Sequence, residues 1–147
     1  MSIRGGDKLA ARLDHIARMA GNASAVKVGF LAEATYPDGT PVAMIGAIQE
    51  FGAPRAGIPP RPFFRTMIAR KQHEWGPAVG ALMIDHDYDA LRVLQLAGEA
   101  IAGQLRQSIV DTNAPPLAES TIKRKGFAKP LVDTGHMLNS VDYEVKE

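Results

Sequence analysis

The sequence predicts an α+β fold in which a small antiparallel sheet packs against one long helix, with an N-terminal helix and projecting loops. Apolar residues recur at steps of three and four over residues 91–109, which is typical of a long amphipathic helix. Apolar and polar residues alternate over residues 25–31 and again over residues 141–146, which is the period of a half-buried strand. We expect these two strands to pair.

The elements before the middle of the chain follow from local signals. Residues 7–20 predict a helix with Asp7 as its N-cap and Gly21 after its end. Its apolar stripe consists of Leu9, Leu13, Ile16 and Ala20. A tight turn at residues 36–40 follows the first strand. Residues 41–51 fit either period, but helix-forming residues and a terminal Gly52 favour a helix.

Prolines divide the rest of the chain. Pro59 and Pro60 fix φ and lack an amide N–H, so we expect a locally stiff, exposed arm there. The arm as a whole, over about residues 52–62, is expected to be flexible relative to the rest of the chain. A helix is expected over residues 62–75, ended by Gly76 and Pro77. The long helix starts at Asp87 or Asp89, and Gly98 and Gly103 within it predict close packing of another helix. A flexible basic loop is expected over about residues 113–130.

The composition limits the number of domains and the classes of function that the chain can have. The chain has 147 residues, enough for one core, so we expect a single domain over residues 1–147. Seventeen lysines and arginines against 16 acids give no global basic excess. The absence of cysteine excludes disulfides and thiolate sites, and it suits the cytoplasm. No stretch approaches the roughly twenty apolar residues of a membrane span, so no membrane partner is expected.

One motif raises the possibility of proteolysis. Asp133, Thr134 and Gly135 match the signature of aspartic proteases, in which two such carboxylates share a proton. That mechanism requires a flap and further β-structure behind the catalytic loop, yet only twelve residues follow Gly135. His136 also stands where Ser or Ala is usual. We therefore expect these three residues to fix a C-terminal turn, with Asp133 capping a short helix through Asn139.

No metal or cofactor site is predicted. Asp85, Asp87 and Asp89 have the spacing of a calcium loop, but Ala90 and Leu96 replace the glycine and the bidentate glutamate that such a loop requires. We expect these acids to favour the positive end of the long helix. The histidines show no i, i+4 pair, and no glycine-rich phosphate loop is present. We therefore expect no catalytic residues and no enzyme.

Two stretches carry the strongest functional signal. The first reads Gln-Glu-Phe-Gly at residues 49–52 and Ile-Pro-Pro-Arg-Pro-Phe-Phe-Arg at residues 58–65. The second, at residues 130–141, reads Pro-Leu-Val-Asp-Thr-Gly-His-Met-Leu-Asn-Ser-Val. In this order and spacing, over roughly the last two thirds of the chain, the sequence resembles the tail-completion, or virion-morphogenesis, proteins of long-tailed bacteriophages and prophages. The resemblance implies a structural protein of the virion that completes the tail and joins it to the head.

The resemblance also implies partners. It implies a ring homo-oligomer, typically a hexamer, that is assembled in the host cytoplasm, contacts connector and tail proteins, and lets DNA pass through. Of the two adjacent phenylalanines, we expect one ring inside the subunit and the other at a subunit contact. The residues expected to contact partners or other copies are Glu50, Phe51, Pro59, Pro60, Arg61, Pro62, Phe63, Phe64 and Arg65.

Two basic clusters leave other functions open. The first cluster consists of Arg55, Arg61, Arg65, Arg70 and Lys71. The second consists of Lys123, Arg124, Lys125 and Lys129. Such clusters can contact DNA phosphates, lie on a solvated face, or pair with acids of a neighbouring subunit. The alternatives are a connector adaptor or tail terminator of the same machinery and, from another class, a small DNA-binding protein.

Overall fold

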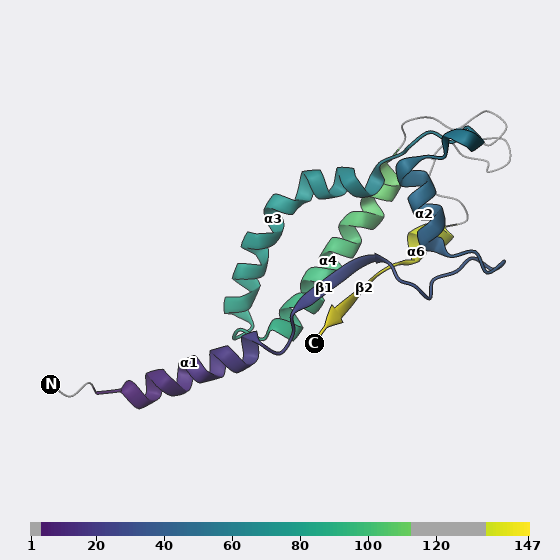
Figure 1. Ribbon diagram of the computed structural model, residues 1–147. Coiled ribbons are helices and arrows are strands. Elements are labelled where there is room, and N and C mark those ends of the chain that lie inside the picture. The colour runs from purple at the N-terminus through teal and green to yellow at the C-terminus, as the bar shows by residue number, and fades with distance from the viewer. Residues whose placement is uncertain (1–3, 113–134) are drawn as a thin grey trace.

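The structure, a computed structural model, describes residues 4–112 and 135–147 and has an α+β fold (Figure 1). Its elements are α1 (Gly6–Ala20), β1 (Ala25–Phe30), α2 (Val42–Phe51), a 3-10 turn at Pro54–Ala56, α3 (Phe63–Asp85), α4 (Ala90–Asp111), α6 (His136–Asn139) and β2 (Val141–Lys146). The long helix α4 packs against the sheet formed by β1 and β2. The predicted fold class is confirmed.

The two predicted strands pair as expected. They run antiparallel, with Ala25 opposite Lys146 and Phe30 opposite Val141. Where α4 crosses the sheet, a Cβ added to Gly98 would lie 2.6 Å from the ring of Tyr143 and 2.8 Å from Val26 Cγ2. The predicted close approach at Gly98 is therefore correct, but the approaching element is the sheet and not a second helix.

Gly98 and Gly103 provide a matched pair for a stability test. We expect Gly98→Ala to lower the free energy of unfolding by about 1–3 kcal/mol, because the added methyl group overlaps the sheet side chains. Gly103→Ala meets nothing within 4 Å, so helix propensity should raise stability by about 0.5–1 kcal/mol. Urea denaturation measures both values. A stabilised Gly98→Ala variant would contradict the close packing of α4 on the sheet.

The core lies where α3, α4, α6 and β2 meet. The Phe63 ring, at the start of α3, contacts the Phe30 ring edge-on, with the ring centroids 6.2 Å apart. The Ser108 hydroxyl of α4 donates a hydrogen bond to the Phe63 carbonyl oxygen at 2.6 Å. The buried residues of this cluster are Val42, Phe63, Met67, Ala102, Leu105, Ile109, Met137 and Val141. The start of α3 is thus fixed against the last turn of the long helix.

The predicted helix starts are partly correct. Asp89 is the N-cap of α4, and its carboxylate accepts a hydrogen bond from the Arg92 amide at 3.2 Å, as one of the two predicted starts requires. The prediction for Asp7 is wrong. Gly5 is the N-cap of α1, so Asp7 lies within the first turn, where a negative charge still suits the helix dipole.

The predicted helix end at Gly76 and Pro77 is also wrong. The helix α3 continues through Pro77 to Asp85 and is visibly bent along its length (Figure 1). A proline inside a helix removes one backbone hydrogen bond and clashes with the preceding turn, which bends the helix or ends it. Here α3 packs on α4, where Trp75 Nε1, two residues before Pro77, donates a hydrogen bond to Gln104 Oε1 at 2.8 Å.

Several predictions fall on residues outside the described ranges. These are the basic loop over residues 113–130, the second basic cluster, and the capping role of Asp133 together with Thr134. The described part of that region begins at Gly135, which has φ 73° and precedes the predicted short helix α6 ending at Asn139. In residues 4–112 and 135–147, the helices are all too short or too polar to cross a membrane.

Candidate protein interface

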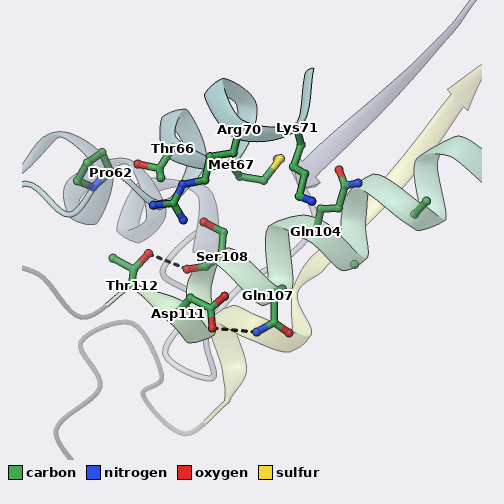
Figure 2. Close-up of a pocket in the computed structure, with 12 residues that line it drawn as sticks. Pro62, Thr66, Met67, Arg70, Lys71, Gln104, Gln107, Ser108, Asp111 and Thr112 are labelled. Carbon is green, nitrogen blue, oxygen red and sulfur yellow. Dashed lines mark hydrogen bonds between the residues drawn. The ribbon is translucent and has the colours of Figure 1, made fainter. Parts of the chain in front are cut away.

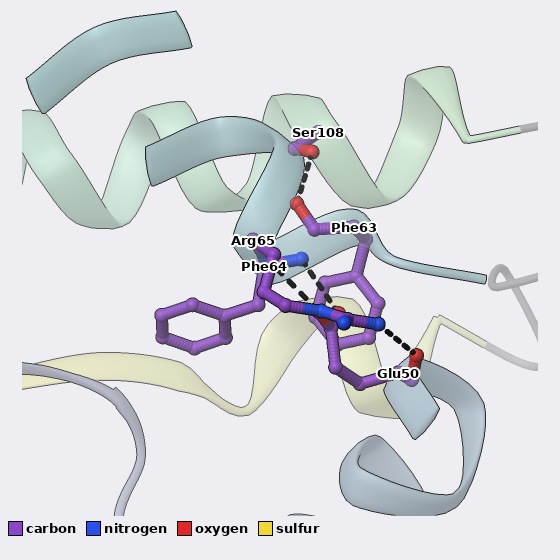
Figure 3. A network of polar contacts seen from close by, with 5 residues as sticks. All are labelled: Glu50, Phe63, Phe64, Arg65 and Ser108. Carbon is purple, nitrogen blue, oxygen red and sulfur yellow. Dashed lines mark hydrogen bonds and ion pairs between the residues drawn. The ribbon is translucent and has the colours of Figure 1, made fainter. Parts of the chain in front are cut away.

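Glu50 joins α2 to α3. It lies on the last turn of α2, is only 5% exposed, and points at the N-terminus of α3 (Figure 3). Its carboxylate accepts hydrogen bonds from the amides of Phe64 and Arg65 at 2.9 and 3.1 Å and from Arg65 Nε at 2.8 Å. The first amides of a helix have no partner inside the helix, and the helix dipole favours a negative charge there. We call Glu50 with these two partners the Glu50 clamp.

The predicted arm over residues 52–62 is a loop that folds back on α2. Gly52 has φ 75°, and a Cβ there would lie 2.8 Å from both the Ile58 carbonyl oxygen and the Pro60 nitrogen. Ala53 and Ile58 form an antiparallel bridge, which closes the loop around the turn at Pro54–Ala56. The segment is therefore a closed loop and not an extended arm, while its flexibility stays a prediction. Local hydrogen bonds close this segment, which we call the proline loop.

Arg61 closes the other end of the proline loop. Its amide donates to the Gln49 carbonyl oxygen at 2.7 Å, and its guanidinium donates to Gln49 Oε1 at 3.2 Å. The side chain is buried, and this burial lowers the pKa of Arg61 below its ordinary value. Glu50, Arg61 and Phe63 were predicted to contact a partner, but all three are buried within the chain. They support the surface from inside.

The other residues predicted at the interface lie at or near the surface. Phe51, Pro59, Pro60 and Arg65 are exposed, while Pro62 and Phe64 are half-buried. The Arg65 guanidinium lies over the Phe51 ring, 5.0 Å from its centroid, so Arg65 contacts the clamp carboxylate and an exposed ring at once. Phe51 is 65% exposed. Met44 lies seven positions earlier on the same side of α2 and is also exposed.

We call Met44, Phe51 and Arg65 the Phe51 face. Aromatic residues, methionine and arginine are enriched in protein interfaces relative to the rest of the surface. Phe63 is buried as one of the two adjacent rings was expected to be. The half-buried Phe64 ring lies 3.5 Å from where a Cβ of Gly29 would stand. A subunit contact through Phe64 stays a prediction.

The described part of the second stretch also packs within the chain. His136 Nε2 lies 2.7 Å from the Thr35 carbonyl oxygen, and the centroids of the His136 and Tyr36 rings are 4.7 Å apart. Met137 and Val141 are buried in the core cluster. These contacts join α6 and β2 to the segment that precedes α2.

Most of the first basic cluster has partners inside the chain. Arg65 pairs with Glu50 at 2.8 Å, Arg61 is buried, and Lys71 lies 3.5 Å from Glu74. A DNA-binding surface needs lysines and arginines that are available to phosphates. The geometry thus gives Arg61 and Arg65 structural roles, whereas Arg55 and Arg70 are exposed.

A groove of about 670 Å³ lies between α3 and α4 (Figure 2). Arg70 and Lys71 line it from α3, and Gln104, Gln107 and Asp111 line it from α4. Sequence reasoning missed this groove, although Gly103 was a signal. Gly103 lines it and has nothing within 4 Å of an added Cβ, so its absent side chain leaves space here in place of the predicted close helix contact.

Asp87 and Asp89, predicted to favour the start of the long helix, also hold α1. Asp87 lies 2.7 Å from both Arg12 Nη2 and His15 Nε2. Hydrogen bonds from these two residues lower the pKa of Asp87 below its ordinary value. The Asn22 side-chain Nδ2 donates to Asp89 Oδ1 at 2.9 Å, and this bond is the largest cause of the lowered pKa of Asp89. Within residues 4–112 and 135–147, no three acidic or histidine side chains converge as a metal site.

Comparison of the chain with models of protein families, with curated proteins and with solved structures finds no match.

Proposed function

We propose that this protein is a structural component of a long-tailed bacteriophage or prophage, where it assembles at the head–tail interface, completes the tail and joins it to the head. The observation that carries this proposal is that the first stretch, residues 49–65, contains buried residues that fix the local structure and exposed residues that form a surface. Its buried members, Glu50 and Arg61, fix the ends of α2, α3 and the proline loop. Its exposed members, among them Phe51 and Arg65, form a surface. The stretch is also the one in which the sequence resembles tail-completion proteins.

A surface of this kind suits assembly. Docking costs conformational entropy when loops and side chains become ordered, and a surface that is ordered beforehand reduces that cost. Gly52 and Pro60 hold the proline loop in one shape, and Arg65 has two partners that limit its motion. In this proposal the partners are other copies of the chain in a ring, together with connector and tail proteins. DNA passes through the ring.

The proposal predicts a joining defect. Lysates of a phage that lacks this protein should contain filled heads and full-length tails that are separate in electron micrographs, because the protein acts through its surfaces. Added purified protein should restore joined particles. Phe51→Asp should restore at least tenfold fewer, whereas Ala78→Asp, which adds the same charge at an exposed site on α3, should restore them as the wild type does.

Other phenotypes would contradict the proposal. Empty heads would assign the protein to DNA packaging, and absent tails would assign it to tail nucleation. Phe51→Asp protein must first be shown to keep the circular dichroism spectrum and melting temperature of the wild type. Restoration by a folded Phe51→Asp variant at wild-type level would remove the Phe51 face from the joining contact.

A further inference from the structure

Two hydrogen bonds hold the walls of the groove between α3 and α4 together. The Ser108 hydroxyl of α4 donates to the Phe63 carbonyl oxygen at 2.6 Å. The Trp75 indole N–H of α3 donates to Gln104 Oε1 of α4 at 2.8 Å. Ser108 and Gln104 both line the groove, so these bonds set the separation of its walls. A groove that exists before its ligand arrives binds with a smaller loss of conformational entropy.

The α4 wall of the groove is made partly of small residues. Ala100 and Gly103 line it about one helical turn apart. Glycine is less favourable than alanine inside a helix. At Gly98 the close approach of the sheet explains the glycine, but at Gly103 an added Cβ would meet nothing within 4 Å. Packing among the described residues therefore does not require glycine here, whereas the close approach of a ligand backbone would.

The α3 wall of the groove carries two positive charges. Arg70 and Lys71 line the groove, and their side chains extend from α3 toward α4 (Figure 2). Arg70 is exposed and pairs with no acid in the part of the chain that the structure describes. Lys71 lies 3.5 Å from the exposed Glu74, and an exposed pair of this kind contributes little. Both cations are thus available to a negatively charged ligand.

The α4 wall distinguishes between two classes of anionic ligand. A phosphate group offers only hydrogen-bond acceptors, and in this groove it would also face the carboxylate of Asp111. A peptide backbone offers both donors and acceptors. The side-chain amides of Gln104 and Gln107 can serve both kinds of group, and the apolar Met67 and Ala100 suit the side chains of a peptide. The lining therefore favours a peptide over a phosphate.

We propose that this groove binds an extended segment of a partner protein, and that an aspartate or glutamate of the segment faces Arg70 and Lys71. The arginine fork can hold a carboxylate through two parallel hydrogen bonds, while the backbone of the segment passes over Gly103. No lining residue belongs to the Phe51 face, so the proposal does not rest on the proposed function.

The dimensions of the groove set the length of the segment. On α4 the groove runs from Ala100 to Thr112, which is about 18 Å at the rise of an α-helix. An extended chain covers that length with about five residues. The volume of about 670 Å³ is open to solvent along one side, so the ends of the segment can continue beyond it.

A library of random pentapeptides displayed on beads tests the proposal, with the full chain as the target. Peptides enriched by the wild type should contain aspartate or glutamate. In fluorescence polarisation, the best of them should bind at least tenfold more weakly to Arg70→Glu protein, and so should its amide counterpart to the wild type. Arg70→Glu protein should itself enrich peptides with lysine or arginine. Arg92→Glu makes the same change at an exposed position of α4 outside the groove and should bind as the wild type does.

Gly103→Leu separates binding from folding. The added side chain enters the groove where nothing lies within 4 Å of its Cβ, and leucine favours a helix more than glycine does. Urea denaturation should therefore show a stability equal to or above that of the wild type. The same variant should bind the enriched peptide at least tenfold more weakly, because the groove is filled. A stable Gly103→Leu protein that binds the peptide as the wild type does would place the binding elsewhere and overturn the proposal.

Two other results would also overturn it. If the wild type enriches no acidic peptide, or if the best peptide binds Arg70→Glu protein equally well, the cations of the groove take no part in recognition. If millimolar inorganic phosphate displaces the peptide, while chloride at the same ionic strength does not, the groove is a phosphate site and not a peptide site.

Discussion

Glu50→Ala is expected to lower the free energy of unfolding by about 3 kcal/mol, because it leaves two helix amides and one guanidinium without their acceptor. The amides of Phe64 and Arg65 lie in the first turn of α3, where the helix itself offers no acceptor. The Arg65 side chain is more exposed than Glu50, so water compensates part of its loss. Urea denaturation followed by circular dichroism measures the change.

Two variants calibrate this expectation. Glu50→Gln keeps one acceptor oxygen but replaces the other with an NH2 donor, so it should cost less than Glu50→Ala and still lower stability. Glu74→Ala removes an exposed acid that lies 3.5 Å from Lys71, and it should cost no more than about 0.5 kcal/mol. If Glu50→Ala cost as little as Glu74→Ala, water would replace the carboxylate and the clamp would have no structural role.

Phe63→Ala is expected to lower the free energy of unfolding by about 3–5 kcal/mol, the usual cost of removing a buried aromatic ring. Phe63 is 1% exposed, contacts the rings of Phe30 and Phe64, and belongs to the core cluster. The cavity left behind is bounded by the long helix and by the sheet, neither of which can move in without disturbing the other. Thermal and urea denaturation should agree on the loss.

The neighbouring phenylalanines form a graded control series. Phe64→Ala should cost less than Phe63→Ala, because the Phe64 ring is only half-buried. Phe51→Ala should change stability by no more than about 0.5 kcal/mol in the monomer, because its ring is exposed. Equal costs for Phe51→Ala and Phe63→Ala, measured at a concentration where the chain is monomeric, would contradict the exposed position of the Phe51 ring.

The regular elements were predictable because their signals are local. The alternation of Val141, Tyr143 and Val145 with polar residues predicted β2, and the capping residue Asp89 marked the start of α4. A helix stripe or a strand period depends only on residues a few positions apart. The antiparallel pairing of β1 and β2 followed because both strands have one apolar face that must be covered.

The details of the candidate interface were not predictable, because they depend on residues distant in sequence. Glu50 was expected at the surface, but its partners lie 14 and 15 positions later, and only the folded proline loop brings them together. Pro77 predicted a helix end by a local rule, but α3 continues through it to Asp85. The stripe of Leu9 and Leu13 indicated a face to be covered without indicating by what, and within the chain it is uncovered.

The pairing of β1 with β2 has a consequence for synthesis of the chain. The Ser24 amide donates to the Lys146 carbonyl oxygen at 2.8 Å, although these residues are 122 positions apart. At a translation rate of about 5–20 residues per second, β1 waits on the order of ten seconds for its partner. During that time Val26 and Val28 belong to an unpaired strand, which other nascent chains can join. The sheet can therefore form only after β2 has been synthesised, and its yield in cells should depend on chaperones that shield β1 in the meantime.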